Sequence, residues 1–428
     1  MARQEADGMT TASLQEAFRW VDDHEREFVD LLLTLLSIDT TNPPGAGYPE
    51  MVDFLEGRLR AAGLQTERVE VPEELITPPM QGRRINLVAR YHNDKPPLGV
   101  YAHMDTVPVE GTWDYSPWGE VRDGRVWGRG ASDLKSSIAA YVGAMEAIHA
   151  LGLSPAYDVV GLLCTDEEVS HQNAGVMYLA KQNYVPHELL CLESGQDPFL
   201  VEGFVGIMVL EVTVKGRSCH SGKAYEGVNA LESMAPILTE LLALKGEVEQ
   251  RISRFQAEPS RRSPSRNRTA RFNLNAIDAN GKHNAIPDRC WLLADRRYIP
   301  EEDADEVEAE LRAAVERGRQ QAPEAEVEVT IKRGYPPMTI DVEGPVAQRM
   351  KHVMKLVQGY SDEDFCRFIS FGSSDMALLQ QLTGSDQMAV FGVGRDGEGN
   401  FHAPNENVRV SDLLAMIKEL VAYFTLPR

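Results

Sequence analysis

Apolar residues follow two alternating patterns along the first half of the chain. Short continuous apolar runs, typical of strands buried on both faces, alternate with longer stretches whose apolar residues recur every three or four positions, as on one face of a helix. The predicted strands are 85–91, 98–103, 159–164 and 189–192, and the predicted helices are 14–38, 51–62 and 136–151. This alternation predicts an α/β domain with a mostly parallel sheet.

The pattern changes near residue 205. The next segments are a strand, a helix, two strands, a helix and a strand, at 207–214, 229–252, 272–277, 291–297, 302–321 and 326–331. This βαββαβ order predicts a ferredoxin-like unit. Pro336 and Pro337 then mark a boundary, after which a helix, a strand and a helix follow at 344–358, 389–393 and 411–424. We therefore predict a larger domain in two parts, 1–205 and 335–428, with a small domain, 206–334, inserted between them.

Composition narrows the possible partners and location. The 428 residues include 43% hydrophobic and 25% charged residues, as in soluble globular proteins, and carry a formal net charge of −22. Such acidity argues against nucleic-acid binding, and no apolar run approaches the length of a membrane span. The five scattered cysteines are expected to be buried free thiols in a reducing compartment, so the cytoplasm is the expected location.

One basic stretch stands out in this acidic chain. It runs from Arg261 to Arg271 and contains five arginines. The plain interpretation is an exposed loop. The alternative is that the stretch binds an anionic acyl group or side chain of a substrate.

Chemically reactive side chains follow several predicted strands, where α/β proteins place their ligands. His103 and Asp105 end one strand, and residues two apart on a strand point the same way. Asp105 can therefore accept a hydrogen bond from one imidazole nitrogen and leave the other for a metal. Asp133 lies in a glycine-rich turn that opens a helix, where it is either an N-cap or a carboxylate that bridges two metal ions.

Further acids and a second histidine complete the set. Asp166, Glu167 and Glu168 directly follow a buried strand, a costly place to crowd like charges without cations. Glu193 follows another strand, and His402 lies in a loop after the strand 389–393. Each residue alone is more often structural. Together they form a ligand set that suits a pair of zinc ions.

In these motifs the chain resembles the zinc-dependent amidohydrolases typified by acetylornithine deacetylase, succinyl-diaminopimelate desuccinylase, aminoacylase and glutamate carboxypeptidase. The resemblance covers essentially the whole chain. It implies that His103 and Glu193 hold one zinc ion, that Glu168 and His402 hold the other, and that Asp133 bridges both. Cobalt and manganese are compatible with the same ligands.

The resemblance also implies the catalytic roles. Glu167 would be the general base, and Asp105 would orient the first metal-binding histidine. A zinc-bridging hydroxide would attack the amide carbonyl of the substrate. His220, in the segment 218–222, resembles the histidine of a lid motif that reaches the active site of the partner subunit. This motif implies a homodimer formed through the inserted domain.

Four further residues are implied to bind the substrate. Asn284 and Arg297 match positions that bind a substrate carboxylate, a role that suits a bidentate guanidinium. Gly372 and Ser373 lie in a segment that resembles a loop touching the substrate. The structural alternatives are a turn residue at Asn284 and a strand-edge ion pair at Arg297.

Three functions remain open. The first is a deacylase or desuccinylase acting on an N-acyl amino acid, which glutamate rather than aspartate at position 193 favours. The second is an exopeptidase, either a carboxypeptidase or a dipeptidase, that uses the same two metal ions on a short peptide. The third is a metal-free relative that only binds acyl amino acids, which is disfavoured because all six ligand and base positions are filled.

Overall fold

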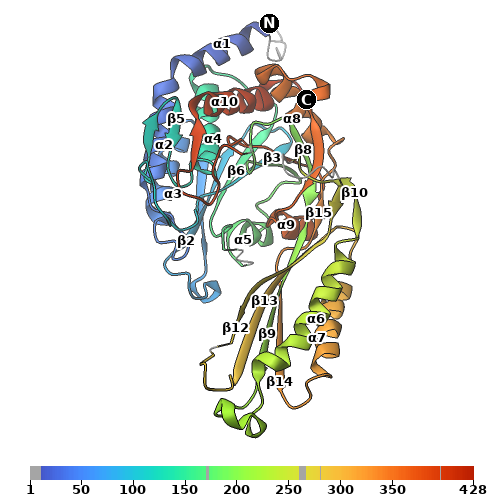
Figure 1. Cartoon of the computed structure of the whole chain (residues 1–428). Helices are drawn as coiled ribbons and strands as arrows, with labels where there is room; N and C mark the ends of the chain where they lie inside the picture. The colour runs from blue at the N-terminus through green and yellow to red at the C-terminus, as the bar shows by residue number, and fades with distance from the viewer. Residues whose placement is uncertain (1–10, 170–172, 260–266, 280, 396) are drawn as a thin grey trace, which may run out of the picture. The chain divides into compact units, whose positions relative to one another are not determined.

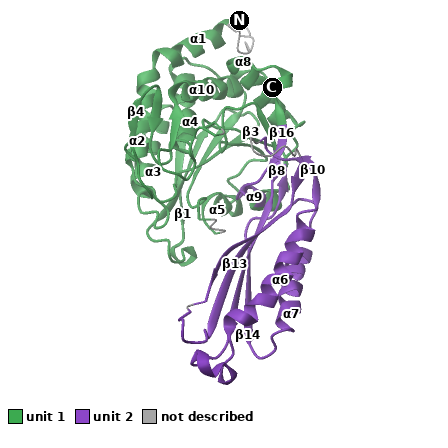
Figure 2. Ribbon diagram, viewed as in Figure 1, with its two compact units in different colours: residues 1–201, 340–366, 378–428 green, residues 202–339, 367–377 purple. Residues whose placement is uncertain are grey.

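The computed structural model of the chain describes residues 11–169, 173–259, 267–279, 281–395 and 397–428 (Figure 1). It divides into two compact units, coloured separately in Figure 2. Unit 1 comprises Met1–Val201, Ile340–Cys366 and Leu378–Arg428, and unit 2 comprises Glu202–Thr339 and Arg367–Ala377. Unlike the boundaries predicted from the sequence, this division assigns the short segment 367–377 to the second unit.

Unit 1 is built on a six-stranded sheet. In spatial order its strands are Gln65–Val71 (β1), Arg84–Tyr91 (β2), Asp158–Cys164 (β6), Pro97–His103 (β3), Glu188–Cys191 (β7) and Met388–Val390 (β17). The last four run parallel to one another, whereas β2 runs antiparallel to both of its neighbours. Every residue of β6 is buried, as a strand covered on both faces requires. The mostly parallel α/β sheet predicted from the sequence is confirmed.

Helices cover this sheet, and their bounds correct one prediction. They are Thr11–Asp23 (α1), Glu25–Ser37 (α2), Tyr48–Ala61 (α3), Lys135–Ala150 (α4), Gly175–Lys181 (α5), Pro345–Gln358 (α8), Met376–Thr383 (α9) and Val410–Thr425 (α10). The single helix predicted over 14–38 is wrong. The backbone breaks at His24 (φ −105°, ψ 16°), whose Nδ1 lies 2.7 Å from the carbonyl oxygen of Trp20. The apolar periodicity continues across the break, so the sequence pattern conceals it.

Smaller elements complete the chain. One three-stranded sheet contains Asn407–Arg409 (β18), Arg125–Trp127 (β5) and Glu120–Arg122 (β4), and another contains Met338–Thr339 (β15), Phe199–Phe204 (β8) and Cys366–Ser370 (β16). Short 3-10 turns lie at Glu73–Leu75, Ser221–Glu226 and Asp362–Asp364.

None of the described helices is long and apolar enough to cross a membrane. All five cysteines are free, but Cys366 is exposed, contrary to the expectation of buried thiols.

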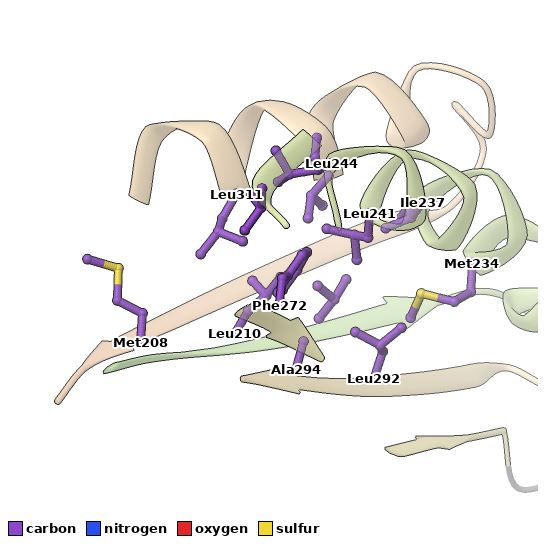
Figure 3. Packing of buried hydrophobic residues seen from close by; sticks show 14 of the residues in the cluster. Met208, Leu210, Met234, Ile237, Leu241, Leu244, Phe272, Leu292, Ala294 and Leu311 are labelled. Atoms are coloured by element: carbon purple, nitrogen blue, oxygen red, sulfur yellow. The ribbon is translucent and has the colours of Figure 1, made fainter. Parts of the chain in front are cut away.

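Unit 2 carries a four-stranded antiparallel sheet with two helices on one face. Its strands, in spatial order, are Arg271–Asp278 (β12), Arg289–Tyr298 (β13), Gly206–Lys215 (β9) and Glu326–Arg333 (β14), and its helices are Ala230–Val248 (α6) and Ala304–Arg319 (α7). Alternate residues of β9 and β13 are buried beneath the helices, where Phe272, Leu292 and Leu311 meet in the core (Figure 3). This strand order and the βαββαβ succession confirm the ferredoxin-like unit.

The helix predicted over 229–252 is too long. α6 ends at Val248, and Ile252 begins the strand Ile252–Gln256 (β10). This strand pairs antiparallel with Asn267–Thr269 (β11). Ile252 is 60% exposed, so it does not continue the buried face of the helix. The pairing of β10 with β11 in a hairpin overrides the local periodicity.

Candidate metal centre

Two imidazoles converge on one carboxylate at the ends of the strands of unit 1. His103 Nε2 lies 3.2 Å from Asp133 Oδ1, and His402 Nε2 lies 3.1 Å from Asp133 Oδ2. His402 Nε2 is also 3.1 Å from Glu168 Oε2. Each oxygen of Asp133 therefore faces a different ring. A carboxylate that bridges two cations needs this arrangement, with one oxygen and one imidazole for each ion.

His103 is held by the residue two positions further on. Its Nδ1 lies 3.1 Å from the backbone carbonyl oxygen of Asp105 and 3.5 Å from Asp105 Oδ1. The backbone oxygen, rather than the carboxylate that the sequence pointed to, is thus the nearer partner. Either contact fixes the ring so that Nε2 is the atom facing Asp133.

The carboxylate of Asp105 organises the neighbouring acidic loop. Its Oδ1 accepts a hydrogen bond from the backbone N–H of Glu167 (3.3 Å), and its Oδ2 accepts one from Glu168 (3.1 Å). Asn42 Nδ2 donates to Oδ2 as well, at 3.2 Å. Asp105 therefore ties the end of β3 to the loop that follows β6, and so places the two acids beside the histidines.

Asp166, the first acid of that loop, is bound by side chains that are not candidate metal ligands. Its carboxylate accepts hydrogen bonds from Asn42 Nδ2 at 2.7 Å and from Tyr48 Oη at 3.2 Å, and it forms an ion pair with Arg84 at 3.2 Å. Both members of the ion pair are fully buried. Asp166 adopts a positive φ of 61°, which turns the chain so that the following two acids leave in another direction. These partners precede the loop by more than 70 residues, and no local signal marked them.

Glu406 connects the remaining two segments. It is fully buried and accepts hydrogen bonds from the backbone N–H groups of Gly130 (3.1 Å), Ser132 (2.8 Å) and Asp133 (2.9 Å), and it also pairs with Arg129. The loop that carries His402 thereby holds the loop that carries Asp133. Sequence reasoning missed this role, although an acid four residues after a candidate ligand was a usable signal.

Glu193 lies two residues beyond β7, as the sequence indicated. One of its carboxylate oxygens is within 4.8 Å of one from Glu167. Two carboxylates this close repel each other unless a positive charge lies nearby. The structure thus brings Glu193 next to the candidate base, and its pairing with His103 on one ion stays a prediction.

The charges at this centre favour cations. Burial lowers the pKa of His103, but its hydrogen bonds to Asp105 and Asp133 reverse this and raise that pKa well above its ordinary value. Contacts with Asp133 and Glu168 raise the pKa of His402 to about 10. Burial and the charge of Asp133 raise the pKa of Glu168. The carboxylates thus draw positive charge toward them, and divalent ions can supply it in place of the imidazole protons.

The donor set fits divalent metal ions. His103, Asp133 and Glu168 each offer one ligand atom, all within 4.8 Å of one another. Glu168 Oε1 is buried and has no hydrogen-bond partner among the described residues, an uncommon and costly state for a carboxylate oxygen. Imidazole and carboxylate ligands together suit zinc, cobalt and manganese.

Two candidate residues lie together in unit 2. His220 is exposed, and its Nδ1 accepts a hydrogen bond from Gly222 N at 3.1 Å. A β-bridge joins His220 to Ala285, and the backbone N–H of Ser221 donates to the carbonyl oxygen of Asn284 at 3.0 Å. His220 and Asn284 therefore belong to one surface, just before β13 begins.

Arg297 lies at the other end of the same strand. It is eight residues beyond Arg289, the first residue of β13, which corresponds to about 26 Å of extended strand. Its Nε is 3.1 Å from Asp295 Oδ2. A small substrate cannot touch both Asn284 and Arg297 within one chain.

Gly372 and Ser373 follow β16 in a short loop of unit 2. The backbone N–H of Gly372 donates to Ser370 Oγ at 3.1 Å, and its carbonyl oxygen accepts from Val205 N at 3.2 Å. These contacts fix the loop's course within the unit. A role of the loop in substrate binding stays a prediction.

Comparisons with known proteins confirm the resemblance drawn from the motifs. The model of peptidase family M20/M25/M40 matches residues 99–425. The chain is 27% identical, over 91% of its length and 96% of the other protein, to a succinyl-diaminopimelate desuccinylase of Xanthomonas oryzae pv. oryzae.

Solved structures share the fold. The dipeptidase Dug1p of Saccharomyces cerevisiae matches with a TM-score of 0.77 and 16% identity, covering 97% of this chain and 98% of that one. The metallo-carboxypeptidase Sso-CP2 of Sulfolobus solfataricus matches with a TM-score of 0.75 and 19% identity, covering 94% and 99%.

Proposed function

This chain belongs to peptidase family M20/M25/M40, and on that footing we propose that it hydrolyses N-acyl amino acids, releasing the acid and the free amino acid. Family membership and the relatives make it a metal-dependent amidohydrolase. The choice of an N-acyl amino acid is the proposal. The observation that carries the chemistry is Asp133, whose two oxygens face two different imidazoles.

Two zinc ions are the proposed cofactors. The ligands would be His103, Asp133, Glu168, Glu193 and His402, with Asp133 shared between the ions. When bound, such ions polarise the scissile carbonyl and lower the pKa of water toward 7. Asp105 and Glu406 support this set through hydrogen bonds to the loops that carry the ligands.

Glu167 is the proposed general base. Its backbone N–H is bound by Asp105, and it is next to the proposed ligand Glu168 in sequence. Of this pair, Glu168 would bind the metal and Glu167 would transfer the proton. The Glu167 carboxylate takes a proton from the attacking water. It then gives this proton to the amine nitrogen as the C–N bond breaks.

We propose that the working enzyme is a homodimer. Asn284 precedes β13, and the strand extends about 26 Å from Arg289 to Arg297, so Asn284 and Arg297 can serve one substrate only if two chains contribute. His220 shares a surface with Asn284, and the two would enter the partner's site together. There His220 would donate a hydrogen bond to the oxyanion that forms during attack. The free thiols, three of them buried, support the cytoplasm as the proposed location.

The same catalytic centre could serve an exopeptidase, which is the second candidate. Two solved structures with this fold are a dipeptidase and a carboxypeptidase. Both reactions cleave an amide near a carboxylate, so the metal centre alone does not separate them. Glutamate at position 193 favours the deacylase.

A substrate panel tests the proposal. Metal-replete protein is assayed for release of free amine from N-acetyl and N-succinyl amino acids beside matched dipeptides. The deacylase proposal predicts higher kcat/KM for the acyl amino acids. Turnover of dipeptides alone would establish the exopeptidase instead.

Two variants test the base. Glu167→Gln should retain its metal and lose about 10²- to 10⁴-fold in kcat, the usual contribution of a general base. Glu73→Gln, the same change on an exposed turn, should behave as wild type. Unchanged turnover in Glu167→Gln would remove this residue from the mechanism.

Mixed dimers test the shared site. Glu167→Ala and His220→Ala chains are unfolded, mixed in equal amounts and refolded together. Random pairing leaves one intact site in half of the dimers, so about a quarter of wild-type activity should return. No recovery, from dimers shown to be mixed, would contradict sharing of the site.

A further inference from the structure

We propose that Arg268 and Arg271, beside Arg297, form an anion site in unit 2 that binds a second carboxylate of the substrate, a specificity that rests on the proposed hydrolysis of N-acyl amino acids. The site binds a different group of the substrate from the carboxylate next to the scissile amide. It takes one class of ligand, a dicarboxylate. Part of the basic stretch noted in the sequence, residues 261–266, lies outside the described residues.

Two of the arginines oppose each other across the sheet. Arg271 of β12 and Arg297 of β13 are direct partners in the antiparallel ladder. Such partners place their side chains on the same face, with Cβ atoms about 4.5–5.5 Å apart, and like charges there are destabilising. Arg297 has Asp295 as a counter-charge at 3.1 Å. Arg271 forms no ion pair with any described residue, so an anion bound here would relieve the repulsion.

Arg268 adds a third, largely desolvated charge. Its Nη2 donates to the carbonyl oxygen of Ile369 at 3.1 Å, whereas its buried Nε has no partner in the described part of the chain. Burial lowers the pKa of Arg268, Glu258 opposes this, and the nearby charge of Arg271 lowers it further. The guanidinium of Arg268 is thus partly buried, lies close to a second guanidinium and lacks one hydrogen-bond acceptor. A guanidinium in this state is suited to bind an anion.

The nearby carboxylates do not neutralise the group. Among the described residues, Glu258 acts on Arg268 and Asp295 pairs with Arg297, so three guanidinium groups have two carboxylates beside them. The chain as a whole carries −22 charges and would repel a dianion at long range. Capture of a dianion therefore needs a local positive site of this kind.

The site adjoins segments predicted to touch the substrate. Arg297 is itself the predicted ligand of the carboxylate beside the amide. The carbonyl that Arg268 binds belongs to Ile369, three residues before Gly372 in the predicted substrate loop. The carboxylate beside the amide occupies the guanidinium group of Arg297. Arg268 and Arg271 therefore remain available for a second carboxylate. That second group can come from the acyl chain or from the side chain of the amino acid.

Matched substrates distinguish these sources. N-succinyl-alanine and N-butanoyl-alanine differ in the acyl carboxylate, and N-acetyl-glutamate and N-acetyl-glutamine differ in the side-chain carboxylate. The inference predicts that wild type prefers the dianion in one pair by about 10- to 100-fold in kcat/KM, as charge-assisted hydrogen bonds provide. Arg268→Gln should remove most of this preference and leave the monoanion rates within about threefold.

Controls separate recognition from support of the loop. Arg254→Gln changes a 73% exposed arginine in the same hairpin and should keep the full preference. Arg268→Lys retains the charge without the fork and should keep part of it. Equal losses for both members of a pair in Arg268→Gln would show that the residue only supports the loop, and would overturn the inference. So would a wild type without preference in either pair.

A binding measurement tests the site apart from turnover. Succinate and butanoate have the same carbon chain but carry two and one carboxylates. They are titrated by calorimetry onto metal-replete wild type and Arg268→Gln. Tighter binding of succinate to wild type, lost in the variant, supports the site even if only dipeptides are hydrolysed and the proposed function fails. Equal affinities in wild type, or a difference that survives in Arg268→Gln, contradict it.

Discussion

Substitution of Glu406 by glutamine should destabilise unit 1 and weaken metal binding together. In the fully buried carboxylate, one oxygen accepts hydrogen bonds from Ser132 N and Asp133 N, and the other accepts from Gly130 N and Arg129. A glutamine amide offers one oxygen and one NH2 group. Whichever way it turns, the NH2 faces two donors that previously had an acceptor.

The magnitude follows from these contacts. Arg129 is 2% exposed, and removal of its partner leaves a buried charge uncompensated, which typically costs about 3–5 kcal/mol. A backbone N–H that loses its acceptor costs about 1–3 kcal/mol more where the loop cannot relax. We therefore expect Glu406→Gln to lower the free energy of unfolding by about 4 kcal/mol, a large part of the usual 5–15 kcal/mol. Displacement of Asp133 should weaken metal affinity about 10- to 100-fold, as loss of supporting contacts commonly does.

Urea unfolding of the metal-free proteins measures the first effect, and competition with a chelator measures the second. Glu398→Gln is the matched control, because Glu398 also pairs with two arginines, Arg125 and Arg409, but is 36% exposed. The control should lose less than about 1 kcal/mol. A loss below about 1 kcal/mol in Glu406→Gln, with metal affinity unchanged, would refute the role assigned to this residue.

Three further predictions follow from other contacts. Asp105→Asn should lower both metal content and kcat. The two carboxylate oxygens accept hydrogen bonds from the backbone N–H groups of the acidic loop, and the substitution replaces one of these oxygens by an NH2 donor. An Asn variant with wild-type metal content and rate would contradict this. Arg84→Met leaves the buried Asp166 unpaired and should cost about 3–5 kcal/mol in urea unfolding, whereas a cost under about 1 kcal/mol would show that the pair is not needed. Burial raises the pKa of Glu419 to about 8, so the folded state binds a proton more tightly than the unfolded state. Stability should therefore fall from pH 5 to pH 9, and less steeply in Glu419→Gln; parallel pH profiles would contradict it.

The parts of the fold that were predictable depend on local patterns. Strands buried on both faces appear as continuous apolar runs, and β3, β6 and β7 were found within one residue of their ends. Three of the proposed ligands, His103, Glu168 and Glu193, stand at or shortly after the ends of these strands, which is why the apolar pattern drew attention to them. Failures arose where contacts outside the periodic segment decide the outcome, as at Ile252, where pairing with β11 in a hairpin ends the helical pattern.

The candidate metal centre likewise contains residues that local motifs indicated and residues that they did not. His103, Asp133, Glu168 and His402 were recognisable from their motifs, and the structure brings them together. The residues that position them were not recognisable. Asp166 is bound by Asn42, Tyr48 and Arg84, which lie in segments more than 70 residues away. The sequence alone does not show that these segments come close together in the fold. Polar residues of this kind are identified only when their hydrogen bonds are seen.

The proposed enzyme hydrolyses N-acyl amino acids with a pair of metal ions at Asp133. The most direct test is titration of metal-free protein with zinc, with release of amine from N-acetyl and N-succinyl amino acids measured at each step beside matched dipeptides. We expect activity to rise to a plateau at two ions per chain, with higher kcat/KM for the acyl amino acids. Activity that is independent of added metal, or confined to the dipeptides, would contradict it.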